Sequence, residues 1–273
     1  MLNFISTSFS AEHAARYDLA IQADLKGLSL CVIHHDNGGC MALKSYAYTV
    51  VNHNDLDVEL HKIFRQEDLL KLVYRRCICL FISEKSTLIP NELFSREHLH
   101  TYLSFAASLD DLDEIHYKTL SVVGATDVFA IPAPLAQLLH TYHHTVDFFH
   151  QSVPLIHLLH DCGTQNGIAL HFTHTLASFA VVAKKQLMLS NTFAVETFTD
   201  AVYYLGYIMK QLQLLPETTE VYLTGDICDD NTALLSRYYP NITVLGNDGI
   251  ALALNSPAAA TAYRILTESC ICG

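Results

Sequence analysis

Apolar and polar positions along the chain follow an order of elements that occurs twice. In the first half, apolar runs that are continuous or alternate with a period of two predict three consecutive strands. The last two strands are joined by a segment containing Asn37-Gly38, a dipeptide that favours a tight hairpin turn. A helix with apolar positions three and four residues apart comes next, followed by a buried strand. The expected strands are 17–24, 28–34, 40–50 and 77–82, and the expected helix is 55–72.

The second half repeats this order after the polar segment 161–167, which contains two glycines and separates a helix from a strand. Lys184-Lys185 marks the turn of its hairpin. A duplicated order of elements predicts two similar lobes with a cleft between them. The expected strands of this half are 168–174, 176–183, 187–195 and 220–224, and the expected helix is 199–215.

Further elements connect and complete the two halves. The mixture of strands and helices, with an antiparallel hairpin at the start of each half, predicts an α/β fold with mixed sheets. We expect a first lobe over 1–162 and a second lobe over 163–273, with the last helix (256–269) packing back on the first lobe. The remaining expected elements are helices 95–109, 133–144, 154–160 and 231–239, and strands 115–123, 128–131, 146–149, 241–245 and 250–254.

Composition narrows the classes of partner. The chain has 273 residues, of which 51% are hydrophobic, so it can bury a large core. Its formal net charge is -12, whereas a protein that binds nucleic acid or an anionic membrane presents a basic surface. We therefore expect neither as a partner, and no direct membrane insertion, since no run of eighteen apolar residues occurs. The N-terminal residues do not resemble a signal peptide, so the expected location is the cytoplasm, where the eight cysteines stay reduced.

Three stretches carry a resemblance to the actin-like ATPase superfamily. AIQADLKGLSLCVI (20–33) is similar to the first strand, phosphate turn and second strand of that superfamily. Residues 128–160 resemble the strand, Ile-Pro helix and strand that end the first lobe in its pilus-assembly branch, and EVYLTGD (220–226) resembles the strand that ends in paired glycines beside the adenosine. The resemblance implies the duplicated, two-lobed, ribonuclease H-like fold of actin, heat-shock chaperones and sugar kinases. Within the superfamily, the chain resembles a bacterial family classed as a domain of unknown function, similar to pilus-assembly and secretion proteins.

The resemblance also implies a nucleotide site in the inter-lobe cleft, whose first turn normally reads Asp, any residue, Gly, then Thr or Ser. Here Asp24 is present, Lys26 occupies the place of the glycine, and Gly27 comes one residue late. In one interpretation, Asp24 holds a hydrated Mg²⁺ and Lys26 reaches a phosphate of ATP. In the other, the segment is a turn with two solvated charges.

The second and third nucleotide motifs depart further from the pattern. A phosphate needs backbone N–H groups that it can approach closely, which glycine-rich turns provide. The second turn corresponds to His171-Phe172-Thr173-His174-Thr175, which contains no glycine and no carboxylate. The third motif keeps one glycine, Gly225, and places the carboxylate of Asp226 beside the expected nucleotide. Hydrolysis of ATP by the mechanism of the superfamily is therefore not expected.

Other side chains suggest alternatives of a different kind. His140, His143 and His144 can share one face of a helix, and two histidines one turn apart can bind zinc if a third ligand joins them. No HExxH, GxSxG, P-loop or GxGxxG motif is present, so the sequence offers no catalytic residue. The helix over 199–215 carries three tyrosines that we expect to pack against the sheet rather than face a partner.

The sequence supports three hypotheses for the function. The leading hypothesis is a non-hydrolysing binding or assembly module with a protein partner and no required cofactor. The alternative is an ATPase- or kinase-like enzyme with an altered phosphate site, and a weaker alternative is metal binding through the histidines. The candidate cofactor-binding residues, all expected in the inter-lobe cleft, are Asp24, Lys26, Gly27, Gly225 and Asp226.

Overall fold

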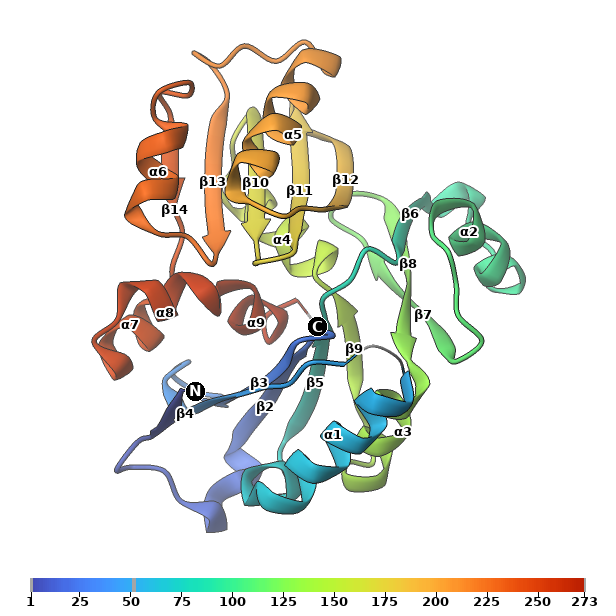
Figure 1. Ribbon diagram of the computed structural model, residues 1–273, viewed down its shortest axis with the longest axis vertical. Helices are drawn as coiled ribbons and strands as arrows, with labels where there is room; N and C mark the ends of the chain where they lie inside the picture. Colours follow the sequence, from blue (N-terminus) through green and yellow to red (C-terminus); the bar gives the residue numbers. More distant parts are fainter. Residues whose placement is uncertain (1, 51–52, 273) are drawn as a thin grey trace.

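Two large mixed sheets form the two halves of the molecule (Figure 1). The computed structural model describes residues 2–50 and 53–272. In the first sheet the strand order is β1-β4-β3-β2-β5-β9, with β2, β3 and β4 antiparallel and with β5 and β9 parallel to β2. The bounds are β1 Asn3–Ile5, β2 Tyr17–Ala23, β3 Gly27–His34, β4 Cys40–Ala47, β5 Arg76–Phe81 and β9 Asp147–His150.

The second sheet repeats this topology with the order β12-β11-β10-β13-β14, in which β10, β11 and β12 are antiparallel and β13 and β14 run parallel to β10. The repetition confirms the predicted duplication. Lys184 and Lys185 both have positive φ and form the turn between β11 and β12, as expected. The bounds are β10 Asn166–Phe172, β11 Leu176–Ala183, β12 Gln186–Ala194, β13 Glu220–Gly225 and β14 Ile242–Val244.

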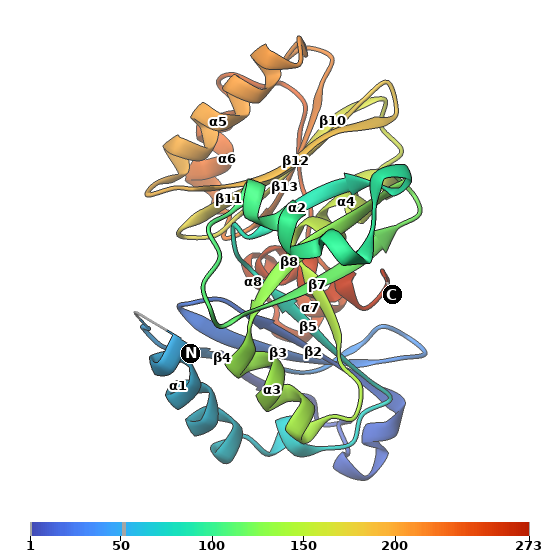
Figure 2. The same ribbon diagram turned by 90° about the vertical axis from the view of Figure 1, so that its right-hand side faces the viewer.

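Helices cover both faces of each sheet. One face of the first sheet is packed by α1 and α3 through Leu60 and Leu139, and the outer face of the second sheet by α5 through Leu205. Between the two sheets lie α4 and α9, whose residues join apolar side chains of both sheets in one cluster (Figure 2). The bounds are α1 His53–Gln66, α3 Ala133–Tyr142, α4 Ser152–Asp161, α5 Phe198–Gln211, α6 Asp229–Leu235 and α9 Arg264–Ser269.

A smaller sheet is inserted between β5 and β9. Its order is β6-β8-β7, and α2 packs on it through Leu103, which contacts Val128 and Ala130. It stands to one side of the two large sheets (Figure 1). The sequence pattern did not predict β6, a short strand whose side chains are only partly buried. The bounds are β6 Ser86–Pro90, β7 Asp113–Leu120, β8 Ala125–Pro132 and α2 Leu99–Ala106.

The expected strand over 250–254 is wrong, because these residues belong to helix α7 (Asp248–Leu254). The Asn247 side chain accepts a hydrogen bond from the Ile250 backbone N–H and caps this helix. The final helix is present, but it breaks at Tyr263 into α8 (Pro257–Ala262) and α9. The hairpin at Asn37-Gly38 is also present, although its connection is longer than two residues and only Gly38 has positive φ. Among the described residues, no helix is long and apolar enough to cross a membrane.

Candidate functional site

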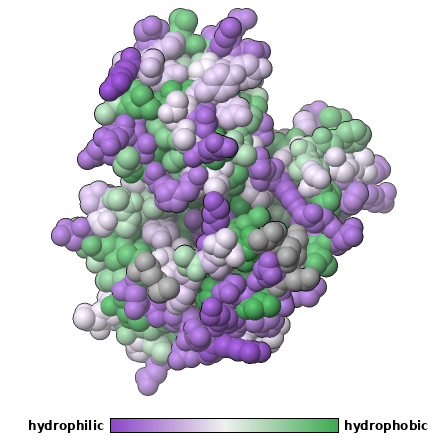
Figure 3. Space-filling model, in the orientation of Figure 1, coloured by the Kyte–Doolittle hydropathy of each residue, from purple (hydrophilic) through white to green (hydrophobic). Residues whose placement is uncertain are grey.

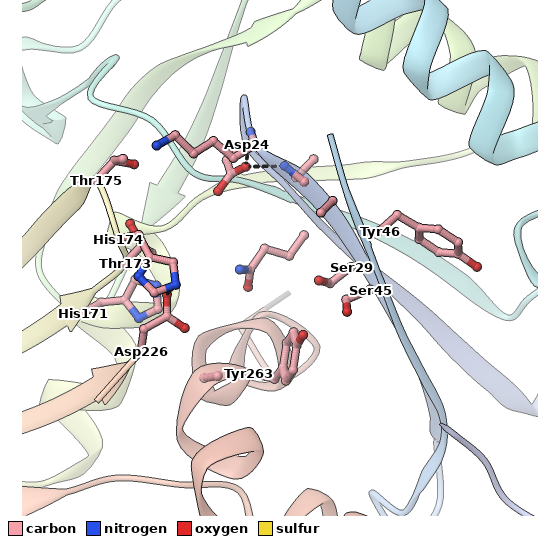
Figure 4. Close-up of a pocket in the computed structure, with 17 residues that line it drawn as sticks. Asp24, Ser29, Ser45, Tyr46, His171, Thr173, His174, Thr175, Asp226 and Tyr263 are labelled. Atoms are coloured by element: carbon pink, nitrogen blue, oxygen red, sulfur yellow. Dashed lines mark hydrogen bonds and ion pairs between the residues drawn. The ribbon is translucent and has the colours of Figure 1, made fainter. Parts of the chain in front are cut away.

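A cleft of about 340 Å³ lies where the ends of β2 and β3 face the ends of β10 and β13. The five candidate residues of the sequence analysis all line it, and Figure 4 shows the first turn opposite the side chains from the second sheet. Tyr263, at the junction of α8 and α9, closes another side of the cleft. The structure therefore brings together Asp24, Lys26, Gly27, Gly225 and Asp226.

The first turn is closed by its own carboxylate. Oδ1 of Asp24 accepts hydrogen bonds from the backbone N–H groups of Lys26, at 2.6 Å, and Gly27, at 2.8 Å (Figure 4). This is the arrangement by which an aspartate stabilises a tight turn. These two N–H groups are therefore already satisfied within the chain, and they are the donors that a phosphate at this turn would require.

Gly27 has a structural reason to be glycine. It begins β3, and a Cβ at this position would lie 2.8 Å from the backbone oxygen of Tyr46 on β4. A side chain would thus push apart two paired strands. The glycine serves the close approach of two strands, independently of any ligand.

The second turn has the same backbone geometry. Ala23 pairs with Leu28 across the first hairpin, and Phe172 pairs with Ala177 across the second, so Thr173 is the structural equivalent of Asp24. This differs from the sequence analysis, which placed His171 at the start of the motif. By the same register, His171 corresponds to Gln22.

Gly225 stands at the end of β13 with φ +96, a conformation that L side chains rarely adopt. A Cβ there would lie 2.0 Å from the backbone oxygen of Phe172, the last residue of β10. The same oxygen accepts a hydrogen bond from the Asp226 backbone N–H at 2.7 Å. Glycine is therefore required at position 225, where the end of β13 passes close to the backbone of Phe172 on β10. The next residue, Asp226, then lines the cleft.

Two carboxylates, those of Asp24 and Asp226, line this cleft. Burial raises the pKa of Asp24 above its ordinary value, and hydrogen bonds from Lys26 and Gly27 oppose that effect. Burial also raises the pKa of Asp226, and the nearby Asp24 raises it further. Oδ2 of Asp226 lies 3.7 Å from Nε2 of His174 on the second turn, and the two form an ion pair when the histidine is protonated. Two carboxylates in one cleft disfavour a third anionic group.

The floor of the cleft contains polar atoms without partners, which the sequence analysis missed. His171 is 1% exposed and neither ring nitrogen forms a hydrogen bond with the described residues. Burial lowers its pKa to about 3, so the ring is neutral. Oε1 of Gln22, its equivalent in the first sheet, is also buried and without a partner in the described chain. An alignment of the two halves by hairpin register would have identified this pair.

Gln151 links the two lobes through hydrogen bonds of its side chain. Its Nε2 donates to the backbone oxygen of Ser83 at 2.6 Å and lies 3.2 Å from the hydroxyl oxygens of Ser178 and Thr192, on β11 and β12. Its Oε1 accepts from the Ser83 N–H at 3.1 Å. Gln151 is fully buried, so these bonds link the first lobe to the second sheet without competition from water.

The histidines of the weaker alternative do not form a metal site. Helix α3 ends at Tyr142, so His143 and His144 leave the helical spacing that would align them with His140. His143 is buried next to Tyr74, and His140 packs edge-on against Phe148. Within residues 2–50 and 53–272, no group of three or more His, Cys, Asp or Glu side chains could hold a metal ion.

Residues 6–242 match the family described as "Protein of unknown function (DUF3822)", and the chain belongs to this family. No curated protein matches it. A crystal structure from Bacteroides thetaiotaomicron, described as a protein with actin-like ATPase fold and unknown function, is 23% identical and has a TM-score of 0.79. That match covers 90% of this chain and 98% of the other.

A chain of the PilM-PilN type IV pilus biogenesis complex is similar as well, with 13% identity and a TM-score of 0.59. The match covers 93% of this chain and 97% of that chain. At these identities the likeness establishes the fold. The predicted actin-like fold, the relation to a family of unknown function and the resemblance to pilus-assembly proteins are confirmed.

Proposed function

We propose that this member of the DUF3822 family is a binding or assembly module that does not hydrolyse ATP and acts with a protein partner in the cytoplasm. One observation carries the proposal. The carboxylate of Asp24 occupies the two backbone N–H groups of its turn, at 2.6 and 2.8 Å, where a phosphate would need them. A phosphate would have to displace a charged acceptor that is held by the same chain.

The charges of the cleft support the same conclusion. A nucleoside triphosphate brings several negative charges, and both Asp24 and Asp226 line the space in which it would lie. Burial raises the pKa of Asp226 and the nearby Asp24 carboxylate raises it further, so the cleft already disfavours negative charge at this position. Mg²⁺ would reduce the repulsion, but the second turn supplies Thr173 where Asp24 stands in the first.

The fold neighbour supports a role in assembly. The PilM-PilN structure is described as a type IV pilus biogenesis complex. A protein of the same fold is thus found in association with another protein. We extend to this chain only the class of function, which is association with a protein partner.

The competing hypothesis is a nucleotide-dependent enzyme that uses the altered site. It is favoured by the convergence of Lys26, Gly225 and the two aspartates on one cleft, whose volume falls within the range of ligand sites. The two hypotheses differ in a measurable quantity, which is the stabilisation of the folded protein by ATP.

Thermal unfolding with and without about 5 mM ATP and Mg²⁺, together with phosphate release, tests the proposal. We expect no change in melting temperature and no phosphate release. If ATP bound with a Kd near 50 μM, it would stabilise the fold by about 2.7 kcal/mol, which corresponds to a rise of roughly 5–10 °C. Asp36→Ala, which removes an exposed carboxylate far from the cleft, is the matched control for Asp24→Ala. A rise that Asp24→Ala abolishes and Asp36→Ala preserves would overturn the proposal.

A further inference from the structure

Helices α5 and α6 both lie on the outer face of the second sheet (Figures 1 and 2). A groove of about 680 Å³ lies between α5 on one side and the end of α6 with the residues that follow it on the other. We call it the tyrosine groove. Hydrophilic and apolar residues are intermixed over the face of the molecule seen in Figure 3. Its lining residues are Thr199, Val202, Tyr203, Gly206, Tyr207, Lys210, Leu234, Tyr238 and Tyr239.

The walls of the groove are exposed tyrosine rings. Tyr203 and Tyr207, one helical turn apart on α5, are 68% and 50% exposed, and their rings are nearly parallel with centroids 6.4 Å apart. Tyr238 on the opposite side is 59% exposed. The expectation that the three tyrosines of α5 pack against the sheet is wrong for two of them. Tyr204 alone packs inward, stacked on Phe193 at 4.2 Å, which holds this helix in place.

The floor of the groove is formed by the largely buried ring of Tyr239, whose hydroxyl is not a fully buried atom and opens on the groove. Tyr239 is 7% exposed, and its hydroxyl donates to no atom in the described part of the chain. It lies against Gly206, where a Cβ would approach the hydroxyl oxygen to 3.3 Å. Glycine is less favourable than alanine inside a helix, but at this position it leaves room beside the Tyr239 hydroxyl.

One end of the groove carries a positive charge, that of Lys210. Lys210 lies at the last turn of α5, and no lining residue is Asp or Glu although the chain contains 28 of them. In a protein with net charge -12, a groove with one cation and no carboxylate favours an acidic group on whatever binds there.

We propose that the tyrosine groove binds an extended, proline-rich segment of a partner protein, with an acidic residue of that segment beside Lys210. A polyproline II segment has no internal hydrogen bonds, so its carbonyl oxygens are free to accept from tyrosine hydroxyls. Its proline rings pack on aromatic faces, and the 6.4 Å between the rings of Tyr203 and Tyr207 matches about two residues at 3.1 Å each. A helical segment has its carbonyl groups occupied and would leave the hydroxyl of Tyr239 without an acceptor.

This inference deepens the proposed function by naming the class of partner and its surface. The experiments on the two proposals can give independent results. Nucleotide binding is tested in the inter-lobe cleft with Asp24→Ala, and peptide binding is tested in the tyrosine groove with Tyr207→Ala. No residue lines both sites.

Fluorescence anisotropy with labelled peptides of about twelve residues tests the proposal. The probes are a proline-rich peptide with an Asp-Glu pair at its first end, the same peptide with the pair at its last end, and a version with every proline replaced by alanine. We expect saturable binding of a proline-rich probe, with one placement of the acidic pair preferred. Tyr207→Ala should weaken binding at least about tenfold, and Lys210→Gln should remove the preference between the two placements.

Two controls keep the result interpretable. Phe105→Ala removes an 88% exposed ring on α2, outside the groove, and should leave binding unchanged. Circular dichroism melting of each variant shows whether the fold is retained, and Tyr207→Phe, which keeps the ring, should bind better than Tyr207→Ala. Absence of saturable binding up to about 1 mM, equal binding of the alanine probe, or insensitivity to Tyr207→Ala would overturn the proposal. It would be overturned equally if sedimentation velocity showed a dimer of this chain that Tyr207→Ala dissociates, because the groove would then bind a second copy.

Discussion

The two hairpin turns that face each other across the cleft occupy equivalent positions and are closed in the same way by different residues. In the first, the backbone N–H of Asp24 donates to the Gly27 oxygen at 3.1 Å, and the Asp24 side chain accepts from backbone N–H groups. In the second, the Thr173 N–H donates to the Leu176 oxygen at 2.9 Å, and the Thr173 hydroxyl accepts from the Leu176 N–H at 3.1 Å. A carboxylate and a hydroxyl thus serve the same turn.

The two turns show that closing a turn and binding a phosphate place opposite demands on the backbone N–H groups. The turn requires a short polar side chain that can accept from the backbone N–H groups that follow it. A phosphate requires that such groups remain free. Both turns meet the first requirement with their own side chains. The presence of Asp24 in the sequence is therefore explained by the turn alone.

The strands that follow differ between the halves. In the first sheet, Phe81 pairs with Ala23, and the Ile82 N–H donates to the Ala23 oxygen. In the second sheet, Gly225 pairs with Phe172 with φ +96, and the next residue enters the cleft as Asp226. The second half therefore depends on a glycine at a position where the first half has phenylalanine.

Gly225→Ala tests that dependence and should have the largest effect. The added Cβ would lie 2.0 Å from the Phe172 oxygen, and φ +96 is strained for alanine, so we expect a loss of about 3 kcal/mol or more in the free energy of unfolding. Gly38→Ala is the control, because Gly38 has φ +66 but open space around its Cβ position, and it should cost about 1 kcal/mol. Urea unfolding measures both, and equal losses would contradict the steric explanation.

His171→Gln makes the second sheet match the first at the position of Gln22, and its effect should depend on pH. The folded-state pKa of His171 is about 3, below the ordinary 6.5, so the stability due to the neutral ring is present above pH 6.5 and is lost as pH falls from 6.5 toward 3. Between pH 7 and pH 5, wild type should therefore lose about 2 kcal/mol more than the variant.

Urea unfolding at the two pH values measures this difference for His171. His100→Gln, at an exposed side chain on α2 away from the cleft, is the matched control and should keep the wild-type pH dependence. If His171→Gln and wild type lose stability equally between pH 7 and pH 5, the buried ring is not the source of the dependence.

Asp24→Thr should have the smallest effect, because it gives the first turn the residue that closes the second. We expect the free energy of unfolding to change by no more than about 0.5 kcal/mol, whereas Asp24→Ala should lower it by about 1 kcal/mol through the lost hydrogen bonds. Thr173→Ala should lower it by a similar amount. Chemical unfolding at pH 7 compares the three, and a loss for Asp24→Thr as large as for Asp24→Ala would show that the turn needs the carboxylate.

Local patterns predicted most of the fold. The two hairpins and the strands β5 and β13 follow from apolar periodicity and turn residues, which act over a few neighbouring positions. The prediction failed at 250–254, where the alternation of small and apolar residues suits a strand, but Asn247 caps a helix. It also failed for Tyr203 and Tyr207, because the exposure of a helical face depends on what packs against it.

The candidate site was predicted as a set of residues but not as a chemical environment. The resemblance to the actin-like superfamily gave the five residues, and the structure places them around one cleft. The occupied N–H groups of the first turn and the unpartnered His171 could not be predicted, because hydrogen-bond partners and burial depend on segments far apart in the chain.

The duplicated order of strands and helices could be predicted without the structure, because hydrophobic periodicity and turn residues are local properties of the chain. Three features emerged from the folded chain instead: Asp24 and Asp226 line the same cleft, Gly27 and Gly225 are needed for backbone contacts, and two tyrosines of α5 are exposed beside α6. Each of these depends on contacts between residues from different elements. Such contacts fix burial, charge and the use of each hydrogen-bond donor, and so they decide the chemistry that one residue pattern can support.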